Sequence, residues 1–142
     1  MAATDNIIQI TGTLGKDPEL KFIQSGRAVC SFSVATNRKW KDRADQWQEE
    51  TCWHNVTVWG DLAENVAASL NKGNRAMVAG RLSTRKYEDR EGVTKYVTEI
   101  IADSVAAELR FATVIVERIE RDKSTSGGTN PPARSFPEEE PF

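Results

Sequence analysis

Several features are scarce or missing in this chain of 142 residues, which contains two cysteines and one histidine. Two cysteines cannot build a disulfide framework, and with one histidine they fall short of the ligands of a structural zinc site. No apolar run approaches the roughly 18 residues that span a membrane, and residues 1–5 lack a signal or transit pattern. We therefore expect a cytoplasmic protein with no membrane contact, no metal and no cofactor.

Catalytic motifs are also scarce. Cys52 and His54 lie two residues apart, but nothing in the sequence marks a third group that would orient them for nucleophilic catalysis. The segment 12–17 contains two glycines and a lysine, but it lacks the spacing and the Ser or Thr of a phosphate-binding loop. We therefore expect no catalytic residues and a protein that is not an enzyme.

Positive and negative charges occupy different parts of the chain, although the formal net charge is only −2. Residues 65–87 include five Lys or Arg and no Asp or Glu, and a second basic cluster lies at 38–43. Each cation taken alone is compatible with a solvated surface, but such clusters suit a phosphate backbone. The candidate phosphate-binding residues are Arg38, Lys39, Lys41, Lys72, Arg75, Arg81, Arg85 and Lys86.

Short segments in which apolar and polar residues alternate predict a mainly β protein. Four such segments, at 8–14, 28–34, 51–59 and 75–87, are separated by turn residues. The charged stretch 38–50 is interpreted as a solvated hairpin loop. Two later segments, 94–102 and 109–119, predict further strands, and the second is apolar on both faces.

One helix is predicted between the middle strands, because Leu62, Val66 and Leu70 recur at helical spacing. Asp61 and Glu64 form a candidate capping box at its start, and Gly73 is the predicted stop. Five or six strands with one helix suit a small closed barrel of the oligonucleotide-binding type, although periodicity alone leaves other β-barrels open. We expect an all-β, five-stranded barrel with one helix, an extra C-terminal strand and a disordered tail.

The C-terminal part of the chain differs in composition from the rest. Residues 1–120 are assigned to the domain, whereas 121–135 lack apolar residues that would offset ordering entropy and are interpreted as a flexible linker. Residues 136–142 place an aromatic at the carboxylate behind three acids, which suits insertion into a hydrophobic pocket rimmed by basic residues. The predicted protein-docking tip is Glu138, Glu139, Glu140, Pro141 and Phe142.

Four aromatic side chains lie among basic and small polar residues. Trp53 and Trp59 occupy the polar positions of their predicted strand, and Trp40 is embedded in charged residues. Tryptophan more often fills a core, but these placements favour an exposed ring. Rings beside cations suit unstacked bases on a strand whose phosphates are neutralised nearby. The candidate stacking residues are Trp40, Trp53, Trp59 and Tyr87.

Several motifs keep their order and mutual spacing along residues 5–105. They are Leu14-Gly15-Lys16-Asp17-Pro18-Glu19, Trp53-His54, Trp59-Gly60-Asp61-Leu62-Ala63-Glu64, Leu70-Asn71-Lys72-Gly73 and Thr84-Arg85-Lys86-Tyr87. With these motifs and its acidic end closing in Pro-Phe, the chain resembles bacterial single-stranded DNA-binding proteins. Two positions depart from the family pattern: Tyr87 stands where many members have Trp, and Asp61 where the residue is often basic.

The resemblance implies a homotetramer that wraps single-stranded DNA without base specificity. It implies that such a protein coats and protects single strands in replication, recombination and repair, and that its acidic tip recruits replication and repair proteins. His54 matches a histidine at a subunit interface, although a core histidine with its hydrogen bonds satisfied is equally compatible with the sequence. Residues 109–119 resemble the additional strand that clasps a neighbouring subunit in actinobacterial members.

Two other functions remain open at this point. A primosome-like barrel would bind protein first and nucleic acid second, but the tail and the tryptophans argue against it. A cold-shock-like barrel would bind RNA, but the sequence lacks the short aromatic-rich strand motif expected of that class. Quenching of tryptophan fluorescence by oligo-dT, compared with duplex DNA, separates these alternatives.

The basic cluster at 65–87 predicts a steep salt dependence of nucleic-acid binding. If about five phosphates are neutralised, the logarithm of the affinity falls against the logarithm of salt concentration with a slope of about −3.5, since each phosphate on a single strand contributes about −0.7. A salt titration of oligo-dT binding measures this slope. A slope near zero would contradict the assignment of these cations to phosphate contacts.

Overall fold

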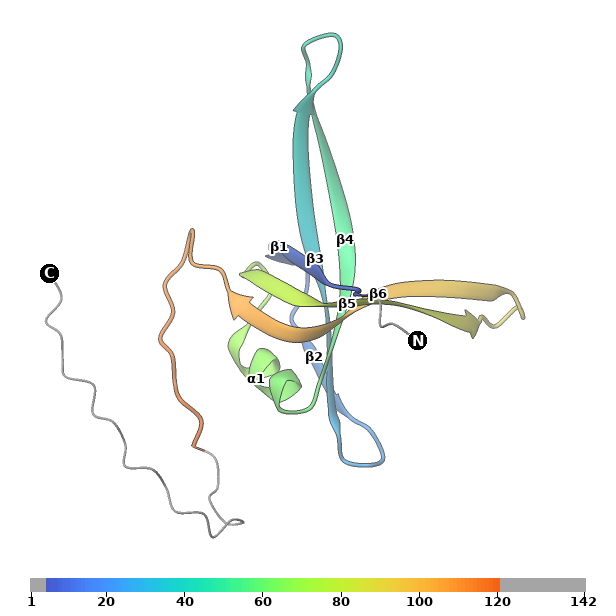
Figure 1. Ribbon diagram of the computed structural model, residues 1–142, viewed down its shortest axis with the longest axis vertical. Helices are drawn as coiled ribbons and strands as arrows, with labels where there is room; N and C mark the ends of the chain where they lie inside the picture. The colour runs from blue at the N-terminus through green and yellow to red at the C-terminus, as the bar shows by residue number, and fades with distance from the viewer. Residues whose placement is uncertain (1–4, 121–142) are drawn as a thin grey trace, which may run out of the picture.

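The computed structural model describes residues 5–120, so the predicted linker at 121–135 and the docking tip at 136–142 lie outside the described residues. Six strands and one helix follow one another along the chain (Figure 1). They are β1 (Ile8–Leu14), β2 (Glu19–Phe22), β3 (Ala28–Lys41), β4 (Trp47–Trp59), α1 (Asp61–Ser69), β5 (Arg75–Glu88) and β6 (Thr94–Ala107).

Five of the strands close into a ring in the order β1-β5-β6-β4-β3, because β1 pairs with both β5 and β3. All pairings are antiparallel except that of β4 with β6, where Val56 lies opposite Ile100. Strand β2 pairs only with β3 and lies outside the ring. The predicted all-β, five-stranded barrel with one helix is confirmed, and the extra strand outside the ring is β2 rather than the predicted C-terminal one.

The core fills the inside of the ring and follows the period-two pattern of the sequence. Strand β3 buries its even-numbered residues from Ala28 to Val34, and β4 buries Val56 and Val58. Side chains at alternate positions point to opposite faces of a strand, so each strand gives one side to the core and the other to the surface. Helix α1 adds Ala63 and Val66 to the same core.

Two glycines allow the ring to close tightly. A Cβ at Gly12 would collide with the carbonyl oxygen of Ala35, and one at Gly80 would collide with the carbonyl oxygen of Ile101. The β5–β6 ladder also shifts its register between Ala79 and Gly80. A bulge at a residue without a side chain bends the strand sharply, as closure of a small barrel requires.

Helix α1 starts differently from the sequence prediction. Its N-cap is Gly60, with φ of 72°, and no side chain caps the helix, so the predicted Asp61–Glu64 capping box is wrong. Because Asp61 is already inside the helix, its carboxylate is placed beyond the N-cap position that a capping box requires. The C-cap is Leu70, and Gly73 forms the following turn. Within residues 5–120 no helix is long and apolar enough to cross a membrane.

The outer halves of two hairpins extend beyond the barrel in different directions (Figure 1). The β3–β4 ladder continues to the pair Lys41↔Trp47, and the β5–β6 ladder to Glu88↔Thr94. The stretch 38–50, expected as a solvated loop, is therefore mostly paired strand with a turn at 42–46. Charged residues are compatible with a strand when both of its faces are in water. Strand pairing supplies the hydrogen bonds of the backbone N–H and C=O groups, and water solvates the charged side chains.

The predicted strand at 109–119 is not formed in this chain. Residues 108–120 follow β6 without strand assignment, and most of this segment runs apart from the barrel in Figure 1. All five strands of the ring already have two neighbours, and no strand of the described residues pairs with this segment. Its side chains remain exposed, with Ile115 at 93% and Val116 at 86%. The extra strand that the fold does contain is β2.

Candidate nucleic-acid interface

Strands β4, β6 and β5 present a continuous surface on the side opposite the core, here called the outer face. Thr57 on β4 pairs with Ile101 on β6, which pairs with Arg81 on β5. Directly paired residues point to the same side of a sheet, and that side recurs every second residue along each strand. The outer face therefore carries Trp53 and Trp59 from β4 and Arg81, Arg85 and Tyr87 from β5.

Trp53 is held on the outer face in an exposed position, with 61% of its surface accessible. Its indole lies over Gly15, where an added Cβ would collide with the ring. A residue without a side chain therefore gives the ring room to lie flat against the barrel. The sequence prediction that Trp53 stands on the polar side of its strand is in agreement with this geometry.

Trp59 lies at the far end of the same strand and is half-buried. The guanidinium of Arg27 sits 4.8 Å from the centroid of its ring, a cation–π arrangement. Both residues line a hollow of about 440 Å³, together with Arg81 from β5 and Leu62 from α1. Arg27 was not among the candidate residues, because it belongs to no basic cluster and reaches Trp59 only through the β3–β4 pairing.

The candidate cations differ in what they already bind. Arg85 is 3.6 Å from Glu99, and Lys41 is 3.5 Å from Asp45. Both pairs are exposed on the cation's side, so they contribute little and leave the cation available to a phosphate. Five others form no ion pair within residues 5–120: Arg38, Lys39, Lys72, Arg81 and Lys86.

Arg75 stands at the start of β5 on the same side of the strand as Arg81, but its cation already has a partner within the chain. Its Nε lies 2.7 Å from a carboxylate oxygen of Glu108, and its guanidinium lies 5.5 Å from the ring centroid of Phe111. Hydrogen bonding to Arg75 lowers the pKa of the Glu108 carboxyl. These contacts hold the start of β5 to the segment after β6. Lys72 lies in the loop before β5 and not on a strand of the outer face, and its backbone N–H donates a hydrogen bond to the Asp17 carboxylate.

The family model described as the single-strand binding protein family matches residues 5–108. The chain belongs to the single-strand binding protein family. The resemblance stated from the sequence motifs is therefore confirmed.

Relatives and a solved structure agree with this family. The single-stranded DNA-binding protein of Paenarthrobacter aurescens is 40% identical over 128 residues, which cover 89% of this chain and 75% of the relative. That of Mycobacterium tuberculosis is 40% identical over 131 residues, covering 91% and 80%. A solved structure described as the Plasmodium falciparum SSB complex with ssDNA matches with a TM-score of 0.71 and 31% identity, covering 76% of this chain and 98% of that one.

The β3–β4 hairpin places two tryptophans on different sides of its ladder. Trp40 lies opposite Gln48 and Trp47 lies opposite Lys41, in two consecutive pairs that point to opposite sides. Arg38 sits 4.8 Å from the Trp40 ring, and Lys41 sits 5.2 Å from the Trp47 ring. Trp40 was among the stacking candidates and Trp47 was not, although the polar neighbours of Trp47 in the sequence were a usable signal.

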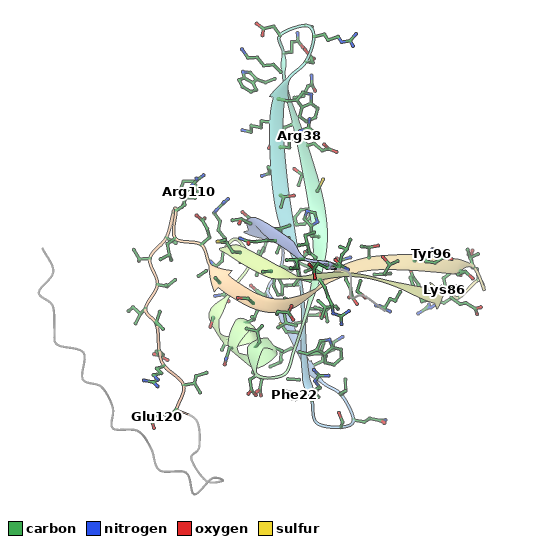
Figure 2. The ribbon with its side chains drawn as sticks, viewed as in Figure 1. Phe22, Arg38, Lys86, Tyr96, Arg110 and Glu120 are labelled. Atoms are coloured by element: carbon green, nitrogen blue, oxygen red, sulfur yellow. The ribbon has the colours of Figure 1, made fainter. Side chains whose placement is uncertain are left out.

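The β5–β6 hairpin also has a different residue on each side. Tyr87 pairs with Lys95 on the side of the outer face, whereas Lys86 pairs with Tyr96 on the other side (Figure 2). Tyr96 is 68% exposed, more than Tyr87 at 40%. Tyr96 was not among the residues that the sequence predicted to stack on bases. Its pairing with Lys86, distant in sequence, is visible only in the folded ladder.

His54 and the two cysteines have ordinary structural environments. The His54 ring is half-buried, with its Nε2 2.9 Å from the Thr36 hydroxyl, so it has a partner within the chain. Its assignment to a subunit interface stays a prediction. Burial raises the pKa of the Cys30 thiol, whereas Cys52 is exposed because its apolar-side position lies beyond the barrel. Residues 5–120 contain no group of three or more metal-ligating side chains.

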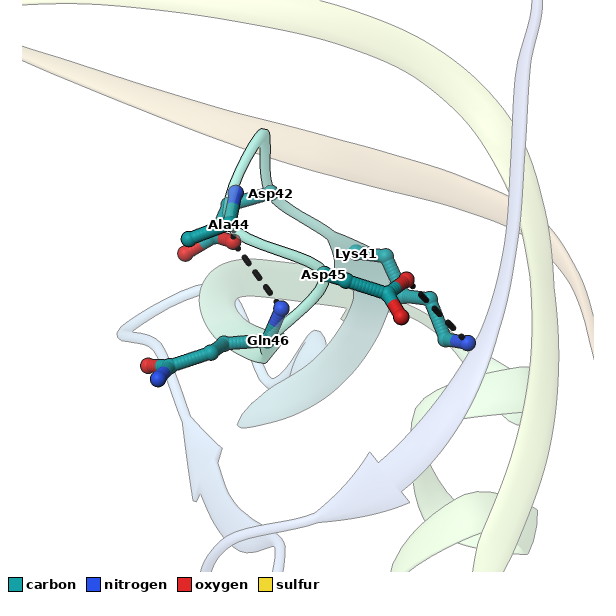
Figure 3. A network of polar contacts seen from close by, with 5 residues as sticks. All are labelled: Lys41, Asp42, Ala44, Asp45 and Gln46. Atoms are coloured by element: carbon teal, nitrogen blue, oxygen red, sulfur yellow. Dashed lines mark hydrogen bonds and ion pairs between the residues drawn. The ribbon is translucent and has the colours of Figure 1, made fainter.

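The tips of both hairpins are built by the same kind of turn. At the β3–β4 tip the Asp42 carboxylate accepts the backbone N–H groups of Ala44 and Gln46, at 2.9 and 3.0 Å (Figure 3). At the β5–β6 tip Asp89 accepts those of Glu91 and Val93, at 2.9 and 3.0 Å. An aspartate that satisfies turn amides in this way orders a loop without help from the core.

These bonds make the β3–β4 tip sensitive to acid. The Gln46 backbone N–H, followed by the Gln48 amide, holds the pKa of the Asp42 carboxyl below its usual value. Because the Asp42 pKa is lower in the folded chain than in the unfolded chain, the ionised carboxylate stabilises the fold fully at a pH above the unfolded-state pKa. This stabilisation is lost as the pH falls through the folded-state pKa. We expect the Ala44 and Gln46 amide resonances to titrate at that lowered pKa, as measured by NMR. Asp42→Asn keeps an acceptor but no titrating group, so persistence of the transition in this variant would contradict the assignment.

Proposed function

We propose that this protein binds single-stranded DNA without reading its sequence, and that it coats and protects the exposed strand. The observation that carries the proposal is the outer face, where Trp53, Trp59 and Tyr87 share one side of the barrel with Arg81 and Arg85. Flat rings accept any base by stacking, and the cations neutralise the phosphates between them. Membership of the single-strand binding protein family supports the same ligand.

The arrangement favours a single strand over a duplex for a physical reason. In a duplex the bases are stacked on each other, so their faces are unavailable to the exposed ring of Trp53. Sequence readout would need side chains that hydrogen-bond to base edges, whereas the outer face offers mainly rings and cations. The protein therefore gains the stacking part of its affinity only from nucleotides that are already unstacked.

We propose a homotetramer, as the resemblance implied. An exposed apolar segment supports association: Val114, Ile115 and Val116 are 50%, 93% and 86% exposed, and such a run in water is costly without a partner surface. His54 is proposed to contribute to a subunit interface, since it lies half-buried beside Thr36 at the rim of the barrel. Association of subunits would bring several outer faces within reach of one strand.

We further propose that the protein acts in replication, recombination and repair and recruits other proteins through residues 136–142. This division assigns DNA binding to residues 1–120 and uses 121–135 as a linker to the docking tip. The sequence of the tip supports it, because three acids followed by Pro-Phe combine charge with one apolar anchor.

Removal of one ring tests the proposed DNA contact. Trp53→Ala should weaken oligo-dT binding about 5- to 150-fold at fixed salt, because one stacked base contributes about 1–3 kcal/mol. Fluorescence anisotropy of a labelled oligonucleotide measures the change. Gly15→Ala should weaken binding less, since it displaces the Trp53 ring without removing it.

Phe22→Ala is the matched control, because Phe22 is 60% exposed but pairs with Ala28 on the other side of the sheet. Its affinity should equal that of the wild type. Unchanged binding by Trp53→Ala, with unfolding temperature preserved, would remove Trp53 from the site.

Deletion of residues 137–142 tests the proposed division of labour. The shortened chain should bind oligo-dT with unchanged affinity, because the rings and cations of the barrel remain. It should lose co-purification of replication and repair proteins from a cell lysate, measured by affinity capture. A loss of DNA affinity along with partner capture would refute the separation of the two roles.

A further inference from the structure

Glu99 is an acidic residue on the face that the proposed function assigns to a polyanion. It lies on β6 two residues before Ile101, so its side chain belongs to the outer face. Only 15% of the Glu99 side chain is exposed. A fixed negative charge beneath a phosphate backbone repels the ligand, so this carboxylate serves a binding surface only through its action on a neighbouring group.

Two side chains from the neighbouring strands hold the Glu99 carboxylate. The Thr57 hydroxyl on β4 donates to Oε2 at 2.7 Å, and Nε of Arg85 on β5 lies 3.6 Å from Oε1. Each carboxylate oxygen therefore faces one of the two strands that pair with β6. Glu99 connects β4 to β5 across the outer face.

The contact with Thr57 does not need the negative charge of Glu99. The ladder between β4 and β6 is short, with residue pairs at Val56 and Thr57, and the Thr57 hydrogen bond reinforces it. A glutamine at position 99 has an amide oxygen that accepts the same hydrogen bond. The charge of Glu99 is therefore explained by its other partner, Arg85.

The ion pair between Arg85 and Glu99 is loose. Its N···O distance is 3.6 Å and the Arg85 side chain is 62% exposed, whereas Arg75 and Glu108 approach to 2.7 Å and the Arg75 side chain is 31% exposed. A cation with the exposure of Arg85 gains little from its ion pair and keeps N–H donors free for another anion. A phosphate that reaches the outer face can therefore displace the carboxylate from the guanidinium.

We propose that Glu99 is a positioning residue that competes with the DNA phosphate for Arg85. In the free protein its carboxylate keeps the Arg85 guanidinium over the outer face, and a phosphate takes the place of the carboxylate when a strand binds. Because the exchange replaces one ion pair with another, Arg85 adds little net affinity and the strand is released readily. The inference rests on the proposed function, because it assumes the same face and the same ligand.

Glu99→Gln in the full chain tests the proposal, because it removes the charge and keeps the acceptor for Thr57. Oligo-dT should bind about 2- to 5-fold more tightly, as expected for the loss of one competing surface charge, and should dissociate more slowly. The salt slope should steepen by about 0.7, since one further phosphate is neutralised. Fluorescence anisotropy measures the affinity and its salt dependence, and stopped-flow fluorescence measures the dissociation rate.

Two further variants and one measurement on the wild type isolate the role of Arg85. Glu64→Gln makes the same change of net charge on α1, where Glu64 is exposed, and its affinity should equal that of the wild type. In an Arg85→Ala background, Glu99→Gln should give no gain, because the cation for which carboxylate and phosphate compete is absent. In the wild-type chain, the Arg85 Nε–H resonance measured by NMR should move when oligo-dT is added.

The outcomes separate this proposal from the function on which it rests. Unchanged or weaker binding by Glu99→Gln, with the unfolding temperature preserved, would overturn the competition for Arg85 while Trp53→Ala still reports the outer face. An equal gain with and without Arg85 would also overturn it, since Glu99 would then act by general repulsion. An Arg85 Nε–H resonance that oligo-dT leaves unmoved would do the same, whether or not the variant folds. Absence of oligo-dT binding by the wild-type chain would instead refute the proposed function itself.

Discussion

The antiparallel ladder between β3 and β4 determines most of what this molecule presents to a ligand. It runs without a break in register from Val29↔Trp59 to Lys41↔Trp47, and the same alternation that buries Val34 and Val56 inside the barrel decides the side of every aromatic further out. Because a slip of one residue would exchange the two sides completely, the buried residues near the barrel determine the orientation of rings that lie far beyond it. Core packing thus specifies the interface even though the two share no side chains.

Stability and binding are accordingly divided between two parts of the same strands. The inner halves contribute the buried residues, whereas the outer halves are exposed on both sides and owe their order to backbone pairing and to aspartate turns at their tips. Large rings such as Trp53 contribute little to the core, so their loss is expected to affect the ligand more than the fold. Arg75 belongs to both parts: it lies on the outer-face side of β5, and its contacts with Glu108 and Phe111 hold the start of β5 to the segment after β6.

The sequence was sufficient for the barrel and for part of the interface. Period-two alternation identified the core side of each strand, and the polar positions of Trp53 and Trp59 predicted their outer-face location. It was insufficient where a partner strand decides the outcome. The charged stretch 38–50 has no apolar pattern, yet pairing makes it strand; 109–119 has a strong apolar pattern, yet without a partner strand among residues 5–120 it forms none. Tyr96 and Arg27 were missed for the same reason, since each acquires its neighbour across a ladder or from a loop, whereas Trp47 was missed although its polar neighbours in the sequence favoured an exposed ring.

The two aspartate turns explain how such long exposed hairpins are held without a core. Asp42 and Asp89 each satisfy two backbone N–H groups, and in each turn the fourth residue has positive φ: Asp45 at 61° and Gly92 at 76°. Gly adopts this conformation freely and Asp tolerates it better than most residues, so both tips close through local chemistry alone. Each hairpin can therefore keep its register while its faces remain free, and a flexible single strand gains most from rings that are already in place before it binds.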